Sequence, residues 1–384
     1  MYTRMINPSP NHSFFLFGPR GTGKTTWIKA TYPNALYINL LDSRQYTSLL
    51  AHPNALESLI PPNFSDFIII DEIQRVPELL NEVHKLIEGP THHKFILTGS
   101  SVRKLRKQGV NLLAGRAYLY HCYPLTATEL GSDFQLSKAL KYGTLPTSYT
   151  SDDPNTYLQS YLSTYLEQEI IQECMTRQLS AFYRFLQTAS FSQGSIINSS
   201  AIAREVMVDR KVVENYFSIL IDLLIGIMLP PFTRRAKRRL TTKSKFYIID
   251  SGLYRAARPQ GYLDSESELG GPALETLFLN ELRAINEYKK LEYQLYYFRT
   301  TTGQEIDFVA YGKNGFNAFE IKLGSVFSHT WTKTLQSFGK DYPEAKLYLL
   351  YMGTQTHYYK NITVLPFTKA ITTLTEILQK PTPK

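Results

Sequence analysis

The stretch that decides the fold runs from Phe14 to Thr25 and reads FFLFGPRGTGKT. An apolar strand leads into a glycine-rich turn, and the turn ends in Lys-Thr where a helix begins. This is the GxxxxGK[ST] loop in the strand–loop–helix context that it requires. Its glycines let backbone N–H groups close around a phosphate, and the helix N-terminus adds its positive end. We expect these residues to hold ATP: Gly18, Pro19, Arg20, Gly21, Thr22, Gly23, Lys24, Thr25 and Thr26.

A second strand end supplies the acids that such a loop needs. The apolar run Phe67–Ile70 is followed by Asp71 and Glu72. We expect Asp71 to hold Mg²⁺ together with Thr25, Lys24 to reach the β- and γ-phosphates, and Glu72 to polarise the attacking water. A buried strand that merely ends in a solvated acidic turn is the alternative.

Two weaker signals follow along the chain. Thr98 and Ser100 come after the run Phe95–Leu97, where a hydroxyl can bond the γ-phosphate or the water; an ordinary strand-to-loop turn is the alternative. Arg116, in the sequence Leu-Ala-Gly-Arg, is a candidate arginine finger acting in trans, and a structural arginine fits equally well.

Composition bounds the protein class. The 384 residues carry 42 Lys and Arg against 33 Asp and Glu, and 43% are hydrophobic, which excludes a disordered chain. The two cysteines exclude a disulfide scaffold. No apolar run suits a signal peptide or a bilayer span, so we expect a cytoplasmic protein without a membrane partner.

Patterning along the chain predicts an α/β fold in three domains. Strands at Phe14–Phe17, Ala35–Leu40, Phe67–Ile70, Phe95–Thr98 and Tyr118–His121 alternate with helical patterns, as in a parallel sheet. We place a P-loop domain at 1–150, with a small lid at about 123–150. A helical linker and a winged helix follow at 151–262, since Ala201–Leu224 reads as helix-turn-helix. A last domain, at 263–384, combines helix and alternating strands.

A basic segment, residues 234–245, follows the helix-turn-helix. No acid lies between Asp222 and Asp250. A hairpin of this kind could lie along phosphates, so we expect contact with nucleic acid, namely DNA. A solvated loop or a wing that packs on protein is the alternative. The candidate contact residues are Arg210, Lys211, Arg234, Arg235, Lys237, Arg238, Arg239, Lys243 and Lys245.

The last third holds an acidic pattern. Asp307 precedes Glu320-Ile-Lys322, in which Glu320 and Lys322 share a strand face. This spacing is typical of PD-(D/E)xK nucleases, which bind Mg²⁺ or Mn²⁺ through hard oxygen ligands and activate water. Glu275, on the preceding helix, would add a ligand. Acids and a lysine that meet by chance on exposed strands are the alternative.

Several phrases resemble the bacterial and archaeal AAA family paired with a DUF4143 region: Asp71–Pro77 (DEIQRVP), Leu-Thr-Gly-Ser-Ser, Leu-Ala-Gly-Arg and Lys245–Leu253 (KFYIIDSGL). The resemblance implies an AAA+ ATPase domain, a lid, a winged helix and a restriction-endonuclease-like end, often assembled as a homo-oligomer. We therefore expect an ATP-hydrolysing, DNA-binding protein whose ATP cycle gates a metal-dependent nuclease. An ATPase switch that binds DNA or protein without cleaving, or a winged-helix transcription regulator, remains open.

Overall fold

The computed structural model describes residues 2–101, 113–172, 179–234, 239–261 and 265–379. It forms two compact units, the first made of residues 3–123 with 222–224, and the second of residues 124–221 with 225–384. Arg235, Lys237 and Arg238, which we predicted to contact nucleic acid, lie outside the described residues. Within the described residues, no helix combines the length and apolarity that a membrane crossing demands.

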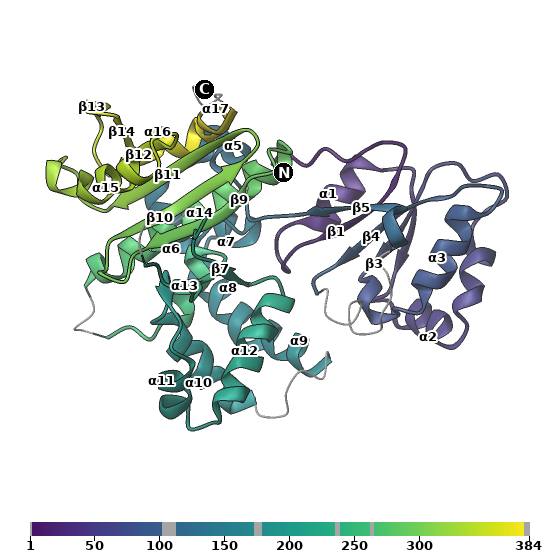
Figure 1. The fold of residues 1–384 in the computed structure, drawn as a ribbon. Coiled ribbons are helices and arrows are strands. Elements are labelled where there is room, and N and C mark those ends of the chain that lie inside the picture. Colours follow the sequence, from purple (N-terminus) through teal and green to yellow (C-terminus); the bar gives the residue numbers. More distant parts are fainter. Residues whose placement is uncertain (1, 102–112, 173–178, 235–238, 262–264, 380–384) are drawn as a thin grey trace. The chain divides into compact units, whose positions relative to one another are not determined.

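The first unit is built on a five-stranded parallel sheet (Figure 1). Its strand order is β2-β3-β4-β1-β5, so β4 separates the strand before the glycine-rich loop from the strand that ends in Asp71. Strands β1, β3 and most of β4 are buried, which explains their continuous apolar runs. The strands are β1 Ser13–Phe17, β2 Leu36–Asn39, β3 Phe67–Asp71, β4 Lys94–Gly99 and β5 Ala117–His121, and the prediction of all five is confirmed.

Among the described residues of this unit, three α-helices accompany the sheet. They are α1 Lys24–Thr31, α2 Ser43–Ala51 and α3 Leu79–Glu88. Helix α3 buries Leu79, Leu80 and Val83, and these side chains join the same hydrophobic core as Phe15, on β1. The core fixes the ends of the strands, and the nucleotide-site residues lie at those ends.

The segment predicted as a lid belongs to the second unit. Residues 124–150 form α5 Ala127–Leu130, α6 Leu136–Tyr142 and α7 Pro146–Thr150. They bond to α13 Ser251–Ala257 and α14 Glu266–Tyr288, more than a hundred residues away: the Ser251 hydroxyl donates to Ala139 O over 2.6 Å, and Ala127 N–H donates to Glu281 over 2.6 Å. These partners place the segment outside the unit that carries the glycine-rich loop, so the predicted boundary at residue 150 differs from the observed one at 123.

A winged helix follows a long helical stretch. The stretch consists of α8 Pro154–Ser160, a π-helical turn at Tyr161–Tyr165 and α9 Leu166–Gln172. The winged helix comprises α10 Leu179–Ser190, β6 Ser195–Ile196, α11 Ser199–Val206, α12 Arg210–Asp222, β7 Gly226–Leu229 and β8 Lys245–Ile248, with strand order β6-β8-β7. Asn198 caps α11 by accepting from Ala201 N–H, and Met207 ends it in a left-handed conformation.

The segment between β7 and β8 is not a free wing. Phe232 N–H donates to Tyr297 O over 2.7 Å, and Thr241 N–H donates to Arg299 O over 3.1 Å. The segment thus borders β9 Gln294–Arg299 on both sides of the residues 235–238, and Phe232 is buried in the core of the C-terminal sheet. Part of the predicted basic hairpin therefore bonds to and packs against the C-terminal sheet of the same chain.

The C-terminal part is a six-stranded mixed sheet (Figure 1). Its order is β13-β14-β12-β11-β10-β9; β9, β10 and β11 form an antiparallel meander, and β11, β12 and β14 are parallel. The new elements are β10 Glu305–Gly312, β11 Gly315–Lys322, α15 Lys333–Asp341, β12 Lys346–Tyr351, β13 His357–Tyr359, β14 Ile362–Pro366, α16 Phe367–Thr372 and α17 Leu374–Gln379. Strands β10 and β11 bring Asp307, Glu320 and Lys322 together.

Candidate functional site

The glycine-rich loop has the backbone that phosphate binding requires. Gly21 and Gly23 adopt φ values of 80° and 85°, a left-handed region that side chains disfavour. Lys24 is buried, and its ammonium donates to Gly18 O at 2.7 Å and Pro19 O at 3.0 Å. Loop carbonyls here take the place that phosphate oxygens would occupy, so the lysine already points into the loop. Arg20 and Thr26 are exposed, and Thr22 is buried and bonds Pro19 O.

The two residues predicted to hold magnesium touch each other. The Thr25 hydroxyl donates to Asp71 Oδ2 over 3.0 Å. The Thr98 hydroxyl donates to Asp71 Oδ1, and Thr98 in turn accepts from Glu72 N–H over 3.1 Å. The residue types and their contacts fit a P-loop that binds ATP with Mg²⁺, which prefers carboxylate and hydroxyl oxygens.

Two residues of this site were missed by sequence reasoning. The Tyr37 hydroxyl, on β2, donates to Asp71 Oδ2, and burial together with this bond raises the pKa of Tyr37. Gln74 is buried, and its amide donates to Glu72 and, over 3.2 Å, to Ser100. Gln74 lies two residues after Glu72, which is a signal that sequence reasoning could have used, whereas nothing in the sequence marks Tyr37.

The backbone at Glu72 is unusual for a glutamate. Its φ of 64° lies in the left-handed region, a conformation that functional sites often retain. The Glu72 carboxylate accepts hydrogen bonds from the Gln74 amide and from the Ser100 hydroxyl, which lies 3.4 Å from Oε2. The predicted catalytic acid is thus held at the strand end by two polar neighbours.

Arg116 makes a different contact from the predicted one. Its guanidinium bonds Glu88, at the end of α3, and is about one-third exposed. A role in a neighbouring subunit therefore stays a prediction, and it would require this ion pair to open.

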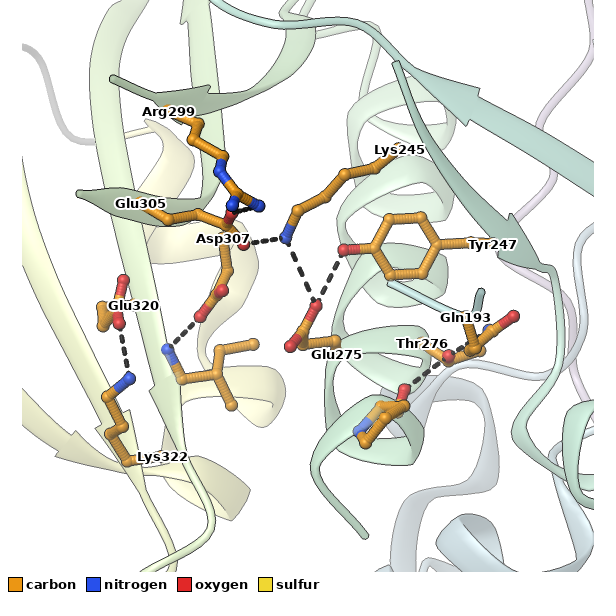
Figure 2. A network of polar contacts seen from close by, with 12 residues as sticks. Gln193, Lys245, Tyr247, Glu275, Thr276, Arg299, Glu305, Asp307, Glu320 and Lys322 are labelled. Carbon is orange, nitrogen blue, oxygen red and sulfur yellow. Dashed lines mark hydrogen bonds and ion pairs between the residues drawn. The ribbon is translucent and has the colours of Figure 1, made fainter. Parts of the chain in front are cut away.

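A second cluster lies within the C-terminal sheet and α14 (Figure 2). Asp307 is buried and accepts from Ile321 N–H over 2.8 Å. Glu320 is also buried; its Oε1 accepts from Lys322 over 2.6 Å, and its Oε2 is among the buried oxygens for which no partner is found in the described part of the chain. Burial, and then the charge of Asp307, raises the pKa of Glu320. The predicted convergence of the Asp…Glu-x-Lys residues is therefore found.

Glu275 is oriented differently from the prediction. Its Oε2 accepts from the Tyr247 hydroxyl over 2.8 Å and lies 3.9 Å from the Lys245 ammonium (Figure 2). Burial, and then Asp307, raises the pKa of Glu275 to about 8. Across the described residues, no group of three His, Cys, Asp or Glu side chains is placed to hold a metal ion, so the predicted three-carboxylate set is not found. What remains is a pair, Asp307 and Glu320, and such a pair fits Mg²⁺, which is commonly held by one or two carboxylates and water.

The prediction that Lys245 contacts nucleic acid is wrong. Its side chain is 2% exposed and its ammonium lies 2.5 Å from Glu305 Oε1, so it faces the acidic cluster and cannot meet DNA. Arg234, Arg239 and Lys243 are exposed, as are Arg210 and Lys211 at the start of α12. Arg210 and Lys243 line one groove of about 460 Å³, together with Asn198, Ser199 and Ser200 at the start of α11.

Comparison with known protein families matches three successive segments of the chain. Residues 10–131 match the AAA domain model, residues 133–264 match a domain of unknown function (DUF8612), and residues 270–370 match a second one (DUF4143). An uncharacterized protein of Mycobacterium tuberculosis is 27% identical over 346 residues, which cover 88% of this chain and 76% of that protein. An uncharacterized protein of Haemophilus influenzae is 24% identical, over 58% of this chain and 61% of its own. The Walker-type ATPase PABY2304 of Pyrococcus abyssi aligns with 65% of this chain and 92% of its own, at 14% identity and a TM-score of 0.42.

Proposed function

Because the chain matches the AAA–DUF4143 family and carries an AAA-type P-loop ATPase domain, we propose that it hydrolyses ATP to control its action on DNA. One observation carries the ATPase part: the Thr25 hydroxyl and the Asp71 carboxylate meet at 3.0 Å, beside a buried Lys24. A magnesium ion bound with ATP would be held by these two oxygens and would neutralise phosphate charge.

The protein's own groups divide the remaining work. Lys24 would exchange the carbonyls of Gly18 and Pro19 for phosphate oxygens. Glu72 would orient and polarise a water, with its carboxylate fixed by Gln74. Thr98 links both acids, because it donates to Asp71 and accepts from Glu72 N–H.

ATP turnover tests this assignment. Lys24→Ala should lower the turnover rate by about 100-fold or more, since a preorganised charge at the phosphates is lost. Lys85→Ala removes an exposed lysine of α3 and serves as the matched control. Equal ATP turnover in wild type and Lys24→Ala, with the circular dichroism spectrum unchanged, would rule out this site.

The action on DNA is supported by the groove on the winged helix. Arg210, at the start of α12, and Lys243, before β8, line the same groove as the start of α11; Glu214 also lines it and lies 2.7 Å from the Arg210 guanidinium. Cations and helix N–H groups of this kind suit phosphate oxygens. Contact would be with the DNA backbone, so affinity should fall steeply with salt.

Salt-dependent binding tests the DNA assignment. Lys243→Ala should weaken binding to every duplex and reduce the salt slope by about one. Lys313→Ala, an exposed lysine of the β10–β11 turn, is the control for the loss of one charge. A protein that binds no DNA at low salt would refute this part of the proposal and favour a protein partner.

A metal-dependent nuclease is a second candidate, favoured by the unpartnered Glu320 Oε2 beside Asp307 and Lys322. A bound Mg²⁺ or Mn²⁺ would supply an activated water and neutralise charge on the phosphate. Incubation of DNA with either ion, with and without ATP, separates the candidates. Shortened DNA products that are formed by the wild type and by the control Glu344→Gln, which changes an exposed glutamate, but not by Asp307→Asn favour cleavage at this site. A mobility shift without products favours an ATPase switch, and a shift limited to one duplex sequence favours a transcription regulator.

The last part of the proposal is that copies of the chain associate with one another. If Arg116 serves the nucleotide site of a second copy, turnover per chain should rise with protein concentration, and Arg116→Ala should remove that rise. Turnover independent of concentration would place Arg116 in the Glu88 ion pair alone.

A further inference from the structure

A buried lysine from the winged helix reaches into the acidic cluster of the C-terminal domain. Lys245 begins strand β8, and its ammonium lies 2.5 Å from Glu305 Oε1 and 3.9 Å from Glu275 Oε2. The same ammonium sits over the Tyr297 ring, 5.4 Å from its centroid. Figure 2 shows it between β10 and α14, pointing toward both carboxylates.

The neighbours of Lys245 hold it in this place. Tyr247 lies two residues later, on the same face of β8, and its hydroxyl also donates to Glu275. Glu305 is bonded from its other oxygen by Arg299 over 3.0 Å. Glu275 and Glu305 are therefore both engaged by groups of the protein itself.

The charges of the cluster are nearly balanced. Four carboxylates, Glu275, Glu305, Asp307 and Glu320, face the three cations Lys245, Lys322 and Arg299. A second divalent ion at Glu275 and Glu305 would have to share these two carboxylates with the Lys245 ammonium, and buried like charges so close together repel each other.

The carboxylate oxygens that remain for a metal ion support the same conclusion. Lys245 and Tyr247 engage Glu275, whereas Glu320 Oε2 is buried and without a partner among the described residues. Asp307 neighbours Glu320 across the β10–β11 pair. The buried oxygen left without a partner among the described residues is therefore Glu320 Oε2, which lies next to Asp307 on the neighbouring strand.

We propose that Lys245 takes the place of a second metal ion, so that the acidic site admits a single divalent cation at Asp307 and Glu320. Lys245 is thus a positioning residue: it fixes Glu275 and Glu305 and sets the number of ions. The inference rests on the metal-dependent candidate above. It also means that a strand of the winged helix forms one wall of the acidic site.

Manganese binding to the full-length, nucleotide-free chain tests this. A Thr25→Ala background removes the ion expected at the P-loop, and Mn²⁺ is counted by equilibrium titration and by its electron paramagnetic resonance spectrum. The background should bind one Mn²⁺, and Asp307→Asn should remove it. Lys245→Met should bind two, with a spin-coupled spectrum, whereas Lys245→Arg should keep one. A purely structural role of Lys245 would not change the number of ions.

Glu275→Gln keeps the inference testable even where Lys245→Met fails to fold. We expect it to bind one Mn²⁺ with an affinity within threefold of the background, because Glu275 serves Lys245 and not the ion. A tenfold or greater loss would overturn the inference, as would a single ion in folded Lys245→Met. If no Mn²⁺ binding depends on Asp307, the metal-dependent candidate itself fails, and this inference with it.

Discussion

Glu281 makes the stability of the second unit depend on pH. Its side chain is fully buried on α14; Oε1 accepts from Ala127 N–H, and Oε2 has no partner among the described residues. Burial raises the pKa of Glu281 to about 8, the Ala127 bond opposes this, and the charge of Glu129 adds to it. The folded chain therefore keeps a proton that the unfolded chain releases near pH 4.5.

The direction and size of the effect follow from this difference. The contribution of Glu281 is fully favourable below about pH 4.5 and is lost as pH rises to about 8, because the folded state binds the extra proton. Each pH unit in this window costs about 1.4 kcal/mol, so from pH 5 to pH 8 the loss is about 4 kcal/mol. Glu281→Gln keeps the acceptor for Ala127 and has no proton to lose.

Urea unfolding at several pH values measures the effect. The chain has two tryptophans, Trp27 in the first unit and Trp331 in the second. In a Trp27→Phe background, fluorescence follows the second unit alone. Glu281→Gln should gain about 4 kcal/mol on its parent between pH 5 and pH 8. Glu268→Gln, an exposed glutamate of the same helix, is the control for loss of one carboxylate.

The comparison is made between variants, so other titrating groups cancel. If the unfolding free energies of Glu281→Gln and its parent run parallel from pH 5 to pH 8, Glu281 is ionised in the folded chain, and the reasoning from burial is refuted.

Three further changes have defined outcomes. Gln74→Ala frees the carboxylate of Glu72 and should lower ATP turnover about 10- to 100-fold while nucleotide affinity, measured by calorimetry, stays unchanged; an equal loss of affinity would contradict this role. In the folded chain, Asp250 Oδ2 accepts from Thr144 N–H and its side chain also accepts from the first N–H groups of α13. Asp250→Asn puts an NH2 group in place of one of these two oxygens, and should lower the free energy of unfolding in urea by about 1–3 kcal/mol. Phe232→Ala empties a site between four aromatic rings and should cost about 3–5 kcal/mol in the same assay; a loss below 1 kcal/mol would show that the segment between β7 and β8 is not docked on the sheet.

The sequence was sufficient for features set by local pattern. The five strands of the first sheet were recognised because buried parallel strands are continuous apolar runs. The contact of Thr25 with Asp71 was foreseeable, since both follow parallel strands at one sheet edge. The pairing of Glu320 with Lys322 followed from the two-residue period of a strand.

Features set by distant contacts were not predictable. Lys245 counted as one more cation of a basic segment, because the partners that bury it, Glu275 and Glu305, lie 30 and 60 residues away. Residues 124–150 were grouped with the chain before them, because the bonds of Ala127 and Thr144 to Glu281 and Asp250 leave no local trace.

Strand β9 is the last strand of the C-terminal sheet, and such an edge normally exposes unpaired N–H and C=O groups. Here Pro230 and Phe232 bond to Tyr297 of this strand, and Thr241 bonds to Arg299. A strand added to this edge by a neighbouring molecule would therefore first have to displace the chain's own segment at Tyr297 and Arg299.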